Sequence, residues 1–211
     1  MDITSALLEH KEKLGELFAR TQKNLDQSTR AFLSQNTDLA KEVFESREDV
    51  KEEFSAFEEN FVRIIALYQP VARDLRALMR SYKIGQDVER ISSLVAKISK
   101  KTVKISDKME VSVPKEFQTQ VDFVQDMLKR SAQAVSSLDV GLCDQVSQDR
   151  GDAKQLKAVL KNKIEVLITD HPGDSSYLVS MLGVARHLDR IADLCSGICH
   201  EIMETEGKKL T

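Results

Sequence analysis

The feature that most constrains the fold is an internal repeat of long helical sequence. The run from Pro70 to Lys100, PVARDLRALMRSYKIGQDVERISSLVAKISK, recurs in pattern as DSSYLVSMLGVARHLDRIADLCSGI from Asp174 to Ile198, at an offset of 100 residues (189 − 89). The identical pairs at this offset are Asp74/Asp174, Leu78/Leu178, Arg90/Arg190, Ile91/Ile191, Leu94/Leu194 and Ile98/Ile198. A period near 100 residues is too long for a solenoid. The repeat therefore indicates one half-domain written twice.

Composition favours helices and excludes several classes of protein. Aromatic residues make up 5% of the chain, Trp is absent, and Gly (8) and Pro (3) are scarce, whereas sheets draw on aromatic residues and on Gly/Pro turns. The net charge of −3 gives no basic excess, which disfavours nucleic-acid binding. No apolar run approaches the roughly 18 to 20 residues of a membrane span, and the polar N-terminus is unlike a secretory signal. Three cysteines, an odd number, fit a reducing compartment, so we expect a cytoplasmic protein.

Apolar residues at steps of three, four and seven predict six helices and no strand. We expect an all-α fold of two tandem three-helix bundles, residues 1–108 and 109–211, because long helices joined by short turns lie antiparallel. The segment 107–116 is the predicted linker, and Asp149 or Gly151 marks the predicted turn between the fourth and fifth helices. The predicted helices run about Ile3 to Leu33, Asp38 to Tyr68, Val71 to Ser106, Phe117 to Gln148, Asp152 to Ile168, and from Ser175 or Ser176 to Glu204.

Acidic residues on the third helix of each half are candidate metal ligands. Asp189 and Asp193 are four residues apart, so both carboxylates lie on one helix face, where like charges destabilise a helix by a few tenths of a kcal/mol. A hard cation between the two carboxylates would turn this destabilisation into stabilisation, because such cations bind several carboxylate oxygens. In the first half the same register holds Glu89 and Ser93. Because serine brings no charge, we expect the first site to be weaker or absent.

Neighbouring helices offer further oxygen ligands. Asp49 and Glu52 lie on the predicted second helix, and Asp149 and Asp152 lie near the predicted start of the fifth. The candidate metal ligands are therefore Asp189, Asp193, Glu89, Asp49, Asp152 and Asp149. Oxygen ligands accept Mg, Mn, Fe or Zn, so the metal is left open. A solvated acidic face with no metal is the alternative that the spacing also fits.

Two other clusters have a functional and a structural interpretation. Arg90 follows Glu89 as Arg190 follows Asp189, which suits either ion pairs between helices or anion binding. Cys195 and Cys199 share a helix face near His187 and His200 and could hold a soft metal. They also continue an apolar stripe, and free cysteine behaves as a small hydrophobe, so core packing is favoured.

The chain lacks the motifs of the common enzyme classes. It has no Gly-rich phosphate loop, HExxH, GxSxG or Glu-x-x-His pair. The absence of Glu-x-x-His pairs argues against a ferritin-like di-iron oxidase. We therefore predict that it is not an enzyme. Two alternatives stay open: a scaffold with decayed metal sites, and a helical-bundle enzyme that uses a carboxylate-bound metal.

Two motifs resemble the PhoU family of phosphate-uptake regulators. The run QPVARDLRALMRSYKIGQDVERISS, from Gln69 to Ser93, is similar to the family signature, and ARHLDRIAD, from Ala185 to Asp193, to its second copy. The resemblance implies two three-helix bundles, a cytoplasmic protein that forms homodimers, and a regulator. Such a regulator restrains the ATPase-driven phosphate ABC transporter and damps the sensor histidine kinase of phosphate starvation.

The resemblance also implies multinuclear metal binding through the family's E/D-x-x-x-D motifs. Glu89 matches the first acid of the first motif, Asp189 and Asp193 fill the second, and Asp74 and Arg76 match the DLR segment. The sequence departs from the family at Ser93, where Asp is usual, and at Ser92 and Ala192, where Gly is usual. The change at residue 93 puts the first metal cluster in question.

Overall fold

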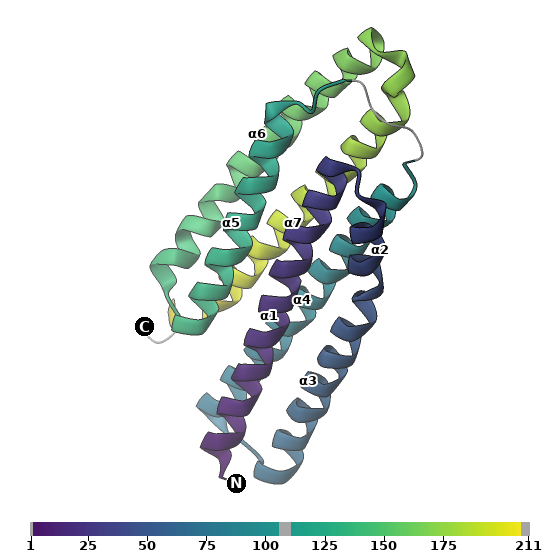
Figure 1. The fold of residues 1–211 in the computed structure, drawn as a ribbon. Coiled ribbons are helices and arrows are strands. Elements are labelled where there is room, and N and C mark those ends of the chain that lie inside the picture. The colour runs from purple at the N-terminus through teal and green to yellow at the C-terminus, as the bar shows by residue number, and fades with distance from the viewer. Residues whose placement is uncertain (1, 106–110, 208–211) are drawn as a thin grey trace.

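The fold is a bundle of long antiparallel helices, as the sequence predicts (Figure 1). It is seen in a computed structural model that describes residues 2–105 and 111–207. Across these ranges there is no strand. The elements are α1 Ile3–Ser34, α2 Thr37–Glu45, α3 Arg47–Tyr68, α4 Ala72–Val103, α5 Lys115–Ser137, α6 Val140–Asp170, the 3-10 turn η1 Pro172–Asp174 and α7 Ser175–Gly207. None of the helices in the described ranges is both long and apolar enough to cross a bilayer.

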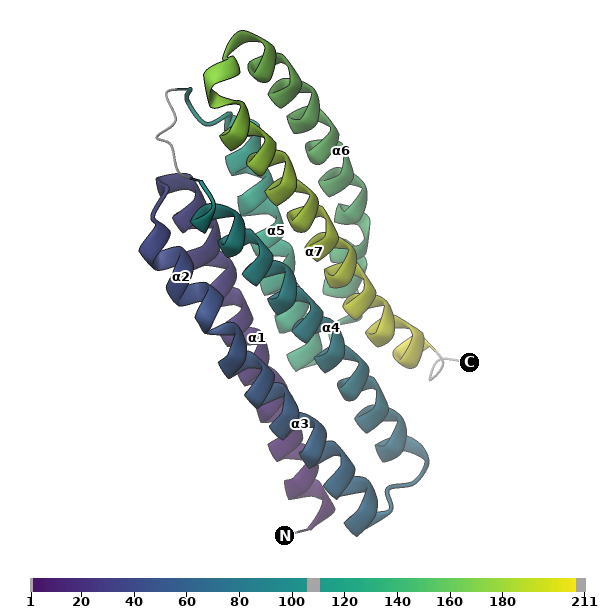
Figure 2. The same ribbon diagram turned by 90° about the vertical axis from the view of Figure 1, so that its right-hand side faces the viewer.

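The two halves pack against each other along their third helices. Helix α4 lies beside α7, and α1 contacts α5 (Figure 2). The ring of Phe32 on α1 lies 5.5 Å from that of Phe117 on α5 and 5.1 Å from that of Tyr177 on α7, measured between centroids. One continuous cluster of buried apolar side chains runs through both halves. The predicted boundary between residues 108 and 109 lies outside the described residues.

The predicted second helix, residues 38–68, is interrupted at Ser46. The Ser46 hydroxyl donates to the Val43 carbonyl (2.9 Å) and accepts from the Asn24 side-chain amide (3.0 Å). Its backbone stays close to helical, at φ −61° and ψ −7°. The chain therefore continues from α2 into α3 in nearly the same direction (Figure 1), and the two segments act as the second helix of the first half.

The prediction of a turn at Asp149 or Gly151 is wrong. The turn between α5 and α6 lies at Leu138, whose φ of 56° is left-handed, and Asp139, whose carboxylate accepts from the Leu142 N–H at 2.9 Å. A glycine inside a helix costs only about 1 kcal/mol, and α6 runs through Gly151 for 31 residues. The predicted fourth helix, which corresponds to α5, is therefore too long by about three turns. The predicted fifth helix, the shortest of the predicted six, corresponds to α6, which is longer than α5.

Candidate functional site

The acidic pair of the second half faces α6, where it meets two cations. One Arg150 side chain reaches both acids: Nη1 lies 3.1 Å from Asp189 Oδ1, and Nε donates to Asp193 Oδ1. The ammonium of Lys157, two turns further along α6, donates to Asp189 Oδ2. Only 12% of the Asp189 side chain is exposed, against 39% for Asp193. Two carboxylates and two cations thus form one compact network.

The first half has a smaller network in the same place. Arg47, the first residue of α3, donates from Nη2 to Glu89 Oε1 and to the Ser93 hydroxyl, the latter at 3.1 Å. Only 11% of the Arg47 side chain is exposed. This network therefore holds one cation, one carboxylate and one neutral hydroxyl. Glu89 and Ser93 occupy the positions of α4 that correspond to Asp189 and Asp193 of α7.

The arginines occupy equivalent positions, which the sequence analysis missed. Arg47 and Arg150 are related by an offset of 103 residues (150 − 47). At the same offset three buried core positions match; these are Val43/Val146, Val50/Ala153 and Phe57/Leu160. The duplication therefore extends to the second helix of each half. Alignment of the two second helices by their apolar stripe is the sequence signal that would have revealed it.

The other candidate ligands lie outside these two networks. Asp49 on α3 lies 3.8 Å from Arg20 of α1, and its side chain is largely exposed. Asp149 on α6 accepts from Arg130 of α5. Asp152 is exposed on α6. Because α6 is unbroken, these two acids lie in mid-helix rather than beside a helix start.

The arrangement does not fit a multinuclear metal centre. Among the described residues, no three His, Cys, Asp or Glu side chains come together as a metal-binding group. Of the six candidates, only Asp189 and Asp193 share a site, and both are bonded to arginine or lysine. A divalent cation placed there would have to displace like charges. The assignment of these residues as metal ligands stays a prediction.

The cysteine cluster belongs to the core. Cys195 and Cys199 are fully buried, as is Cys143 of α6, which confirms the core-packing interpretation. Burial raises the pKa of Cys195 to about 12, so its thiol is protonated at neutral pH and is a poor metal ligand. His200 is exposed, whereas His187 is half-buried and its pKa falls to about 4 through burial and the nearby Lys101.

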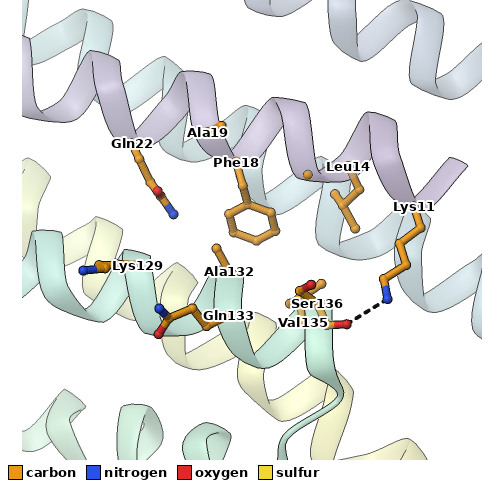
Figure 3. Close-up of a pocket in the computed structure, with 11 residues that line it drawn as sticks. Lys11, Leu14, Phe18, Ala19, Gln22, Lys129, Ala132, Gln133, Val135 and Ser136 are labelled. Carbon is orange, nitrogen blue, oxygen red and sulfur yellow. Dashed lines mark hydrogen bonds between the residues drawn. The ribbon is translucent and has the colours of Figure 1, made fainter. Parts of the chain in front are cut away.

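A separate hollow of about 360 Å³ lies where α1 meets α5 (Figure 3). At one end of the hollow the ammonium of Lys11 donates to the Ser136 carbonyl at 2.8 Å. The remaining lining is mostly apolar or amide in character, with a second cation at Lys129. Its walls hold no carboxylate or imidazole, so this hollow and the acidic sites are chemically unrelated.

The fold and the duplicated acidic motif define a class of proteins made of two tandem three-helix bundles with acidic third helices. The family model described as "PhoU domain" matches residues 14–102 and again 119–202. The chain therefore belongs to the PhoU family, as the motifs predict.

Curated relatives match over most of the chain. A phosphate-specific transport system accessory protein PhoU homolog of Aquifex aeolicus is 27% identical over 190 residues, which cover 90% of this chain and 86% of the relative. The corresponding accessory protein PhoU of Escherichia coli is 26% identical over 182 residues, 86% of this chain and 75% of the relative.

Solved structures share the fold. The phosphate transport system regulatory protein PhoU from Streptococcus pneumoniae superposes with a TM-score of 0.89 at 20% identity, covering 100% of this chain and 99% of that one. PhoU from Pseudomonas aeruginosa gives 0.89 at 21% identity, covering 96% and 97%. Likeness at this level of identity establishes the architecture of two three-helix bundles.

Proposed function

We propose that this protein is a regulator of phosphate uptake of the PhoU type. It is a non-enzymatic, cytoplasmic adaptor that forms a homodimer, restrains the phosphate-specific ABC transporter through its ATPase, and damps the sensor histidine kinase of phosphate starvation. The observation that carries the proposal is the match of the PhoU domain to both halves. The accessory proteins named for phosphate-specific transport, similar over most of the chain, support it.

An adaptor needs a surface for its partners, and the start of α4 provides the best candidate. Four cations at steps of three and four share one face of α4 and line an open hollow of about 670 Å³. The exposed apolar side chains of Leu75, Met79 and Leu138 lie among them. Glu201 and Glu204 line the same hollow, and Lys83 pairs with Glu201 at 3.2 Å, so the charge that steers association lies at Arg73 and Arg76, and apolar contact then stabilises the complex. This surface suits an acidic, partly apolar face on a partner. The four cations are Arg73, Arg76, Arg80 and Lys83.

Deletion of the gene in its own host tests the regulatory role. In phosphate-replete medium we expect phosphate uptake to rise and a phosphate-starvation reporter to become active, because the restraint on both systems is lost. A plasmid copy of the wild-type gene should restore both. Unchanged uptake and an unchanged reporter in the deletion strain would contradict the proposal and favour a scaffold of another system.

The docking surface is tested separately, with purified proteins. The transporter ATPase and the cytoplasmic part of the kinase from the same host would each be titrated with this protein. We expect Arg73→Glu with Arg76→Glu to weaken binding at least about tenfold, since both steering charges are reversed. Arg30→Glu is the control, because Arg30 is exposed and its ion pair is with Asp26 of the same helix. Equal effects of both changes would place the interface elsewhere.

A further inference from the structure

We infer that this protein needs no metal at its duplicated acidic sites, because arginine and lysine from the second helix of each half supply the positive charge that a metal would otherwise bring. Arg150 and Lys157 do so in the second half, and Arg47 does so in the first. The inference concerns how the sites are stabilised and stands whether or not the proposed function is correct.

The first argument is that charges balance at both sites. The second-half site holds the two carboxylates of Asp189 and Asp193 and two cations, one guanidinium and one ammonium. The first-half site holds one carboxylate, Glu89, and one cation. When every group is charged, each network is neutral apart from the exposed Arg190, which lies 3.9 Å from Asp193 and is screened by water. A bound divalent cation would leave each network with an excess of positive charge.

The second argument comes from comparison of the two halves. At the offset that relates Arg47 to Arg150, the residue equivalent to Lys157 is Phe54, which packs against the core. The second cation is therefore present where the second acid is present, and it is absent where Ser93 has replaced that acid. Because Lys157 pairs with Asp189 rather than with Asp193, this pattern is a balance of total charge within each network and not a match of one cation with one carboxylate.

The third argument is the geometry of the arginine. Its planar guanidinium presents several N–H donors at once and can bridge two oxygen acceptors. Arg47 donates from Nη2 to both Glu89 and Ser93, whereas Arg150 donates from Nε to Asp193 and lies within ion-pair distance of Asp189, at 3.1 Å from Nη1 to Oδ1. Each bridge relieves what would otherwise be repulsion or an unpaired charge. Removal of one partner of a buried pair is strongly unfavourable, so a metal could not displace the arginine at little cost.

Metal content is the first test. The full-length protein would be incubated with Mn²⁺, Zn²⁺ or Fe²⁺, passed through gel filtration and analysed for elements. We expect less than about one-tenth of a metal ion per chain, because the carboxylate oxygens are already bonded to cations. One or more ions per wild-type chain that disappear in Asp189→Asn would overturn the inference. Metal that persists when Glu89→Gln is added to Asp189→Asn lies elsewhere and leaves both sites metal-free, as inferred, whereas metal lost only on addition of Glu89→Gln would overturn the inference for the first half.

Replacement of the cations is the second test. We expect Arg150→Gln with Lys157→Gln to melt at a lower temperature than the wild type, and further addition of Asp189→Asn with Asp193→Asn to recover most of that loss. Millimolar Mn²⁺ should raise the melting temperature of the first variant by about 3 °C and leave the wild type unchanged. The inference that arginine and lysine take the place of a metal would be contradicted if the first variant were as stable as the wild type. It would also be contradicted if both proteins responded equally to Mn²⁺.

Two further variants keep the test decisive. Arg190→Gln removes an exposed cation 3.9 Å from Asp193 and is the matched control, for which we expect neither destabilisation nor a response to Mn²⁺. Arg47→Gln repeats the experiment in the first half if the second-half variant does not fold. If Arg190→Gln lost as much stability as Arg150→Gln with Lys157→Gln, the effect would be a general one of charge. That result would overturn the inference that Arg150 and Lys157 take the place of a metal.

Discussion

At the scale of single residues, the cost of a buried charge depends on how much water still reaches it. Asp189 has 12% of its side chain exposed and bonds to two cations, whereas Asp193 has 39% exposed and shares Arg150. An exposed ion pair contributes little because water screens it, while loss of one partner from a buried pair leaves an uncompensated charge. The two acids of one motif are therefore unequal in their contribution to stability.

This inequality is testable with two single substitutions. Asp189→Asn should lower the free energy of unfolding by about 2 to 3 kcal/mol, because it leaves Arg150 and Lys157 without their shared partner. Asp193→Asn should cost less than about 1 kcal/mol. Urea denaturation followed by circular dichroism measures both. Equal costs, or stabilisation by Asp189→Asn, would mean that the cations do not compensate this pair.

Burial also determines the charge state of His10, which is kept neutral. Its ring is almost fully buried, stacks on Phe57 at 4.2 Å between centroids, and bonds through Nδ1 to Asn60 Oδ1 at 3.0 Å. Since an amide oxygen accepts only, Nδ1 carries the proton, and the buried Nε2 has no hydrogen-bond partner. Burial lowers the pKa of His10 to about 4, although the bond to Asn60 opposes that shift.

The shift predicts a pH dependence of stability. The folded-state pKa lies below the unfolded value of about 6.5, so the unfolded chain binds the proton more readily. Stability from this group is fully present above pH 6.5 and falls as the pH is lowered towards 4, by up to about 3 kcal/mol. His10→Gln should flatten the curve of unfolding free energy between pH 7 and 4, measured by urea denaturation. Parallel curves for both proteins would refute the prediction.

At the scale of elements, α6 illustrates how a helix passes through a residue that usually interrupts it. A left-handed Leu138 and the Asp139 cap place the chain reversal before α6. Buried Val146, Ala153 and Leu160 then continue one apolar face on both sides of Gly151. Packing of that face outweighs the modest helix penalty of one glycine.

Two glycine substitutions test this account. Gly151→Ala should stabilise the protein by about 0.5 to 1 kcal/mol, since an added Cβ meets nothing within 4 Å and alanine favours the helix. Gly85→Ala is the contrasting case, because its Cβ would collide with the Phe57 ring; we expect a loss of about 1 to 3 kcal/mol. Thermal denaturation measures both. Destabilisation by Gly151→Ala would mean that α6 is not helical there.

At the scale of the whole molecule, the two halves are repeated in sequence but joined in structure. Phe32 of the first half packs on Phe117 and Tyr177 of the second. Helices α4 and α7 form the seam between the halves (Figure 2). Separation of the halves would expose apolar surface that now lies in a shared core, and such exposure is the main unfavourable term for a small domain.

The shared core predicts cooperative unfolding. The full chain should unfold in a single transition that coincides when followed by circular dichroism and by hydrogen exchange in each half. A chain shortened to residues 1–105 should be aggregation-prone or oligomeric, because it leaves the seam uncovered. The prediction fails if that fragment is monomeric and melts cooperatively near the temperature of the full chain.

Local signals determined much of this protein. The apolar stripes predict the long helices, Pro70 marks the end of α3, and the repeat predicts two matching halves. The spacing of Asp189 and Asp193 places both on one helix face, as the structure confirms by their common contact with Arg150. These features depend on residues within a few turns of each other, which sequence displays directly.

The tertiary structure alone decided what neutralises the acids and where α5 ends. Arg150 lies 43 residues from Asp193, and Lys157 lies 32 residues from Asp189, so these contacts exist only once α6 packs on α7. The left-handed Leu138 has no local signature, since leucine rarely adopts that conformation. An acidic motif predicts that a cation is needed, but helix packing determines whether that cation is a metal ion or an arginine.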